Sequence, residues 1–109
     1  AQRVLLGMRH AMAALARHGN NLIIDDVMLD GDAAEYAEAF KGLAVHWVGV
    51  FAPLEVLEER EKARGDRDLG LSRWLAKHVH KGIKYDLEID TSRATPAESA
   101  ARIKQAFGL

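Results

Sequence analysis

Hydrophobic positions in the first third of the chain follow two different spacings. From Val4 to Ala16 they recur at helical spacing, and Gly19 can end that helix. The following run, Leu22–Leu29, is apolar except for Asp25 and Asp26, which predicts a buried strand. We therefore expect an amphipathic helix and then a strand whose carboxyl end carries two acids.

The rest of the chain alternates between helical and strand-like patterns. Pro53 can open a helix that Gly65 ends, and Thr95 with Glu98 has the spacing of a capping box, with proline between them at the first helical position. The further expected elements are a helix over Asp32–Leu43, a strand over Ala44–Phe51, a helix from Pro53 to Arg64, a helix from Leu71 to about Lys81, a strand over Leu87–Asp90 and a last helix to about Phe107.

This order predicts an α/β protein with a short parallel sheet, because each strand returns through a crossover helix. The 109 residues suit one domain spanning 1–109. The first helix has no strand before it, so the unit is expected to begin in the middle of a three-layer α/β/α fold.

Composition excludes several classes of protein. The chain has no cysteine, so disulfides, thiolate metal sites and cysteine nucleophiles are excluded. Fifteen basic against sixteen acidic residues do not indicate a nucleic-acid or membrane-surface binder. The longest apolar run, Trp47–Leu54, is too short for a membrane helix, and no signal-peptide pattern precedes it, so we expect a cytoplasmic protein.

The positive charge is concentrated between residues 60 and 84. This segment could meet an anion, or it could be a pair of solvated helix faces. Its basic residues are Arg60, Lys62, Arg64, Arg67, Arg73, Lys77, Lys81 and Lys84, and its acidic residues are Glu61, Asp66 and Asp68.

Two groups of residues have side chains of the kind used in phosphoryl transfer: two acids at the end of the first expected strand and three arginines in the basic segment. Asp25 and Asp26 at a strand's carboxyl end could hold the water shell of Mg²⁺ or accept a proton from a hydroxyl. Alternatively, one of them caps a loop or pairs with a lysine. Arg60, Arg64 and Arg67 could stabilise a transferring phosphoryl group from a closing loop. Alternatively, Asp66 simply pairs with Arg64 or Arg67 at the surface.

The turn after the last expected strand is a third candidate. Asp90, Thr91 and Ser92 could contact a nucleotide base, although threonine and serine also simply form turns. His78 and His80 would lie about 200° apart on a helix, so they cannot share a metal. The chain contains no Gly-x-x-x-x-Gly-Lys-Ser/Thr stretch, so it holds no P-loop.

Taken together, four segments resemble the chloramphenicol phosphotransferase-like family of P-loop kinases. The resemblance implies an ATP- and Mg²⁺-dependent transfer of phosphate to a small-molecule hydroxyl, such as that of a chloramphenicol-like antibiotic. According to this resemblance, Asp25 and Asp26 take the Walker B-like position. Arg60, Arg64 and Arg67 belong to a lid over about 60–84, which covers the phosphates of the nucleotide. Asp90, Thr91 and Ser92 lead to the adenine side. The segments are residues 21–29, 45–50, 60–67 and 79–92.

One large departure from that family sets a further expectation. The strand, P-loop, helix and base-bearing strand with which such kinases begin would precede Ala1, so we expect this chain alone to be inactive. The alternative is a non-catalytic oligomeric or nucleotide-binding module that keeps the kinase half-fold. Because the P-loop strand would separate the strands at Leu22 and Ala44, we also expect a homo-oligomer or a strand-swapped assembly.

Overall fold

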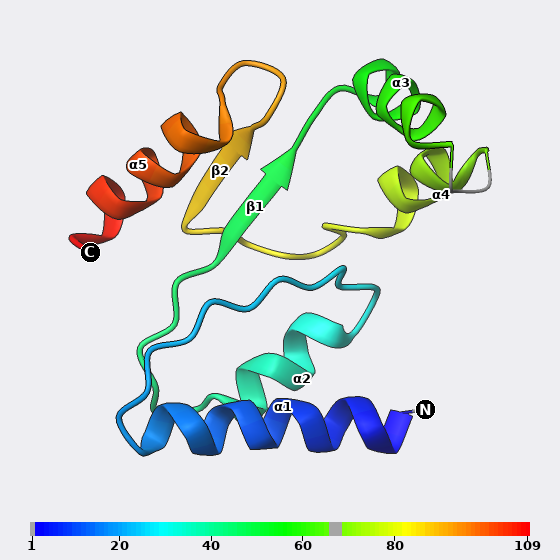
Figure 1. Ribbon diagram of the computed structural model, residues 1–109. Helices are drawn as coiled ribbons and strands as arrows, with labels where there is room; N and C mark the ends of the chain where they lie inside the picture. The colour runs from blue at the N-terminus through cyan, green and yellow to red at the C-terminus, as the bar shows by residue number, and fades with distance from the viewer. Residues whose placement is uncertain (1, 66–68) are drawn as a thin grey trace. The chain divides into compact units, whose positions relative to one another are not determined.

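The computed structural model describes residues 2–65 and 69–109 (Figure 1). It divides into two compact units, residues 1–45 and 46–109, each of which has its own internal contacts. In the described residues, no helix has the length and apolar character needed to cross a membrane.

The first unit is a pair of packed helices, α1 (Gln2–Arg17) and α2 (Asp32–Ala39). Its buried apolar side chains are Ala13, Tyr36, Ala39 and Phe40. The Arg17 guanidinium closes the far end of α2, donating to the carbonyl of Ala39 at 3.1 Å. α2 ends at Ala39 rather than at Leu43, and residues 40–42 form a turn.

The strand expected over Leu22–Leu29 is absent, and this prediction was wrong. Residues 20–29 have no regular secondary structure, and Ile23 is fully exposed. A strand needs a neighbour to bond its backbone N–H and C=O groups, and the described part of this unit offers only helices. The segment has the composition of a strand but has no strand partner in the described residues of its unit.

The second unit contains a two-stranded parallel sheet, β1 (Val48–Phe51) and β2 (Leu87–Asp90), with Val48 opposite Leu87 and Phe51 opposite Asp90. Between the strands run α3 (Leu54–Arg64) and α4 (Leu71–His78), which pack on each other, and α5 (Pro96–Phe107) follows β2 and packs against it (Figure 1). The expected partial α/β fold is confirmed, although β1 is shorter than Ala44–Phe51.

Local signals set the helix ends of this unit. Gly65 ends α3 with φ 69°, a left-handed conformation that glycine adopts readily because it has no Cβ. Thr95 and Glu98 form the expected reciprocal capping box, with Pro96 in the first turn of α5. α4 ends at His78 instead of Lys81, so His80 lies outside the helix, with φ 70°.

Candidate functional site

The carboxyl ends of β1 and β2 form the centre of a polar cluster. Parallel pairing brings Phe51 and Asp90 to the same edge of the sheet. Just beyond that edge, the Thr91 backbone N–H donates to the Phe51 carbonyl at 2.8 Å. The Asp90 carboxylate accepts from the backbone N–H of Ser92 at 2.9 Å and from its hydroxyl at 2.6 Å. The predicted residues Asp90, Thr91 and Ser92 thus form one tight turn.

Arg60 of α3 reaches this turn. One guanidinium nitrogen donates to the Thr91 hydroxyl at 2.8 Å and another to the Thr91 carbonyl at 3.2 Å. The sequence proposed Arg60 and Thr91 as separate binding residues, and the structure shows that they bind each other. This two-point contact anchors α3 beside the carboxyl edge of the sheet.

Hydrogen bonds from Ser92 favour the ionised form of the Asp90 carboxyl. The hydroxyl and backbone N–H of Ser92 lower the pKa of the Asp90 carboxyl below its usual value, with smaller help from Arg93 and Arg60. A hydrogen-bonded carboxylate of this kind is an acceptor held at the end of a strand, not a proton donor.

The α3–α4 hairpin depends on a buried acid that the sequence reasoning missed. Glu61 is 4% exposed, and its carboxylate accepts the backbone N–H groups of Gly70 at 2.7 Å and Ser72 at 2.6 Å. Those N–H groups open α4, whose preceding residue, Gly70, has no side chain to cap them. The signal in the sequence was the glycine at position 70, which cannot cap α4 and so requires an acceptor from another part of the chain.

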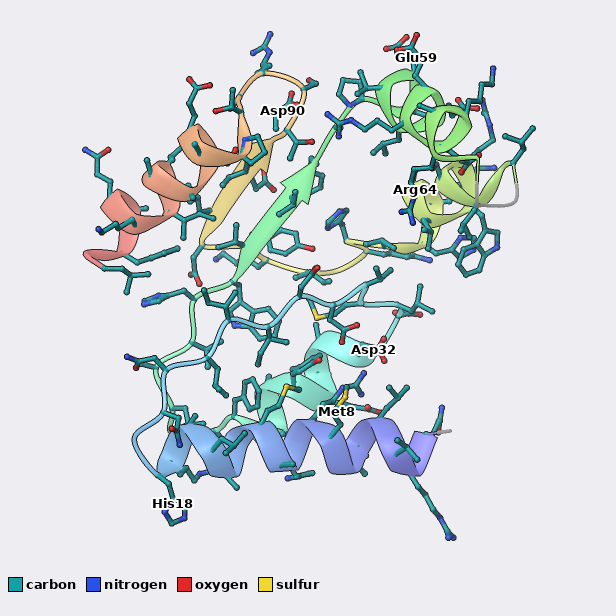
Figure 2. All side chains as sticks on the ribbon, viewed as in Figure 1. Met8, His18, Asp32, Glu59, Arg64 and Asp90 are labelled. Carbon is teal, nitrogen blue, oxygen red and sulfur yellow. The ribbon has the colours of Figure 1, made fainter. Side chains whose placement is uncertain are left out.

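The other arginines predicted to belong to a lid are Arg64 and Arg67. Arg64 is an exposed residue in the last turn of that helix (Figure 2). Arg67, the third predicted arginine, lies outside the described residues. A nearby surface ion pair joins Arg73 of α4 to Glu58 of α3 at 3.2 Å and ties the two helices together.

An open groove of about 600 Å³ runs along β2 and α5 of the same unit. Asp90 and Phe51 line it, so it adjoins the polar cluster at the sheet edge. Its volume falls in the range of small-molecule sites. The other lining residues are Glu88, Ile89, Arg93, Ala94, Glu98, Ser99 and Arg102.

Phe51 belongs to an aromatic cluster with His80 and Tyr85. The His80 ring lies 4.1 Å from the Phe51 ring, and His80 Nδ1 shares a hydrogen bond with the Tyr85 hydroxyl. Burial lowers the pKa of His80. Gly49 leaves the space these rings use, because a Cβ there would lie 2.6 Å from both Phe51 and Tyr85.

The predicted acids, Asp25 and Asp26, belong to the first unit, where both are exposed. Asp26 accepts a hydrogen bond from the Tyr36 hydroxyl at 2.6 Å. Burial raises the pKa of Tyr36, and the hydrogen bond to Asp26 adds to that effect. The described residues contain no group of three or more His, Cys, Asp or Glu side chains placed to hold a metal ion.

Comparison with known proteins identifies the family of the chain. The family model described as "Chloramphenicol phosphotransferase-like protein" matches residues 1–108. The chain therefore belongs to the chloramphenicol phosphotransferase-like family.

Two curated proteins of Mycobacterium tuberculosis are similar to the chain. They are named "Putative O-phosphotransferase Rv2636" (strain H37Rv) and "Putative O-phosphotransferase MT2714" (strain CDC 1551). Each is 38% identical over 93 residues, which make up 84% of this chain and 41% of the relative. The chain thus spans about two fifths of the length of these relatives.

Proposed function

We propose that this chain supplies the carboxylate pair and the arginine lid of an ATP-dependent phosphotransferase that acts on a small-molecule hydroxyl. The observation that carries the proposal is the two-point contact between Arg60 and Thr91. It fixes a helix bearing two of the lid arginines beside the carboxyl ends of parallel strands, where α/β proteins bind ligands.

The side chains fit the groups that such a reaction needs. Mg²⁺ prefers oxygen ligands and is commonly held by one or two carboxylates together with water and phosphate oxygens, which suits Asp25 and Asp26. Bound Mg²⁺ would supply neutralisation of phosphate charge. Arg64 and Arg67 would bind phosphate oxygens, and the groove beside Asp90 would take the nucleoside end of ATP.

The test is a chimera in which this chain replaces the 93 matched residues of the Mycobacterium tuberculosis relative. ATP consumption is measured with a panel of small-molecule alcohols, including chloramphenicol. Arg64→Ala and Arg67→Ala should each lower turnover about 10²- to 10³-fold, because each removes a donor to the transferring phosphoryl group. Their melting temperatures should barely change.

Lys104→Ala, which removes an exposed cation of α5, is the matched control and should leave turnover unchanged. A chimera that folds but consumes no ATP with any alcohol would overturn the proposal. Full turnover in an arginine variant would show that this arginine is only a surface charge. The 109-residue chain alone should bind ATP no better than about millimolar, because it holds no P-loop.

A second candidate, an oligomeric module, is favoured by the exposed apolar side chains of the first unit. Ile23 is 102% exposed and Val27 is 55% exposed, in a segment with strand-forming composition. Such a segment can pair with a strand of another copy. The two candidates differ in their readouts, ATP turnover for the first and concentration-dependent association for the second.

A further inference from the structure

The most deeply buried polar side chains of the first unit form one connected network. Arg9 of α1 is 2% exposed and Tyr36 of α2 is 3% exposed. The Arg9 guanidinium lies 4.7 Å from the centre of the Tyr36 ring and pairs with Asp32 at 3.3 Å and with Glu35. Two acids and an aromatic face offset the cost of burying this cation.

The network continues from Tyr36 to the acid pair. With its ring held against Arg9, Tyr36 presents its hydroxyl to Asp26 Oδ2 at 2.6 Å. Asp32, the first residue of α2 (Figure 2), accepts the backbone N–H of Leu29 at 2.9 Å. Residues 20–29 have no regular secondary structure, and these contacts tie the acid-bearing segment to α2.

We propose that Tyr36 is a positioning residue for Asp26: its hydroxyl holds Asp26 Oδ2 and so orders the carboxylate, whose other oxygen would be available to a divalent cation. Arg9 acts one step further back, by fixing the Tyr36 ring. This inference rests on the proposed function for its cation, whereas the ordering of Asp26 by Tyr36 is a property of the chain itself. Partners of this kind orient a metal-binding side chain without touching the metal.

The experiment uses the 109-residue chain and Mn²⁺ as the probe, followed by paramagnetic broadening of the backbone amide signals of Asp25 and Asp26. Tyr36→Phe should raise the Mn²⁺ dissociation constant about 10-fold. The matched control is Tyr85→Phe, which removes the chain's other tyrosine hydroxyl, and it should leave the constant unchanged. Asp26→Asn should abolish the specific broadening.

A second measurement needs no metal. Three-bond couplings to Asp26 Cγ should report a single χ1 rotamer in the wild-type chain and averaged rotamers in Tyr36→Phe. An unchanged rotamer distribution, or an unchanged Mn²⁺ constant in a wild-type chain that binds the ion, would overturn the proposal. If the wild-type chain shows no Mn²⁺ broadening, the proposed cation site fails while the couplings still decide whether Tyr36 orders Asp26.

A folding defect in Tyr36→Phe would not leave the question open. Asp26→Asn keeps an oxygen that can accept from the Tyr36 hydroxyl, so its side chain should retain a single rotamer. Averaging in that variant would show that the hydroxyl does not hold position 26 and would overturn the proposal. Circular dichroism melting curves accompany each variant.

Discussion

The Arg60 guanidinium binds both the hydroxyl and the carbonyl of Thr91, and Thr91 in turn binds the carbonyl of Phe51. The neighbouring elements β1 and α3 therefore both bind the turn after β2, about thirty residues further along the chain, at one residue. The arginine that we propose for phosphate binding thus also anchors α3. Arg60 is accordingly part of the frame of the site as well as a candidate ligand.

The coupling between Arg60 and Thr91 is measurable by a double-mutant cycle of Arg60→Ala and Thr91→Val. We expect a coupling free energy of about 0.5–1 kcal/mol, the size typical of an exposed charge-assisted hydrogen bond. Urea unfolding is followed by tryptophan fluorescence, because Trp47 and Trp74 both lie in the second unit. Thr91→Ser keeps the hydroxyl and should retain most of the coupling. Additive effects of the two mutations would mean that the contact does not anchor α3.

Glu61→Gln should lower the free energy of unfolding of the second unit by about 1–3 kcal/mol. The amide keeps one acceptor oxygen but loses the charge that favours two backbone N–H groups at the start of α4. Glu59→Gln on the exposed face of the same helix (Figure 2) is the matched control and should be nearly neutral. Equal effects of the two changes would contradict a capping role for Glu61.

Gly49→Ala should lower the free energy of unfolding by about 1–3 kcal/mol, because the added methyl group meets the rings of Phe51 and Tyr85. Gly7→Ala in α1 is the opposite case: nothing lies within 4 Å of its new Cβ, and alanine is the better helix former. That change should raise the melting temperature of the first unit. A stabilised Gly49→Ala variant would contradict this prediction, because it would show that the rings of Phe51 and Tyr85 move aside at little energetic cost.

Stability of the second unit should fall as the pH drops below about 6.5, the ordinary pKa of histidine. Burial lowers the pKa of His80, so the folded state holds fewer protons than the unfolded state, and acid favours unfolding. The check is the urea midpoint by tryptophan fluorescence at pH 7.5 and 5.5. His80→Gln should flatten this dependence, whereas His10→Gln, an exposed change in the other unit, should not. An equally steep dependence in both variants would assign the effect to other groups.

Light scattering should show the chain associating with itself as its concentration rises. The cause is the exposed apolar segment around Ile23 and Val27, whose backbone finds no strand partner in the described part of its unit. Ile23→Asp should shift the distribution toward monomer, and Leu109→Asp, at another exposed apolar position, should not. A wild-type chain that stays a monodisperse monomer and binds no hydrophobic dye would contradict this expectation.

Local chemistry in the sequence determined the presence of the helices, the last strand and the turn formed by Asp90, Thr91 and Ser92. The capping box at Thr95, the glycine stop at Gly65 and the helical spacing from Val4 each act within a few residues, so they can be read directly. The order of elements likewise gave the α/β class. The positions of Asp90 and Thr91 followed from the end of β2.

Tertiary structure alone decided which residues bind one another and which apolar segments are covered. Leu22–Leu29 has a strand's composition, but a strand exists only where a neighbour pairs with its backbone, and none is present in the described residues of its unit. The contacts of Tyr36 with Asp26 and of Arg60 with Thr91 join residues ten and thirty-one positions apart. No periodicity or motif encodes such pairs, because they depend on how helices and strands pack rather than on local backbone preference.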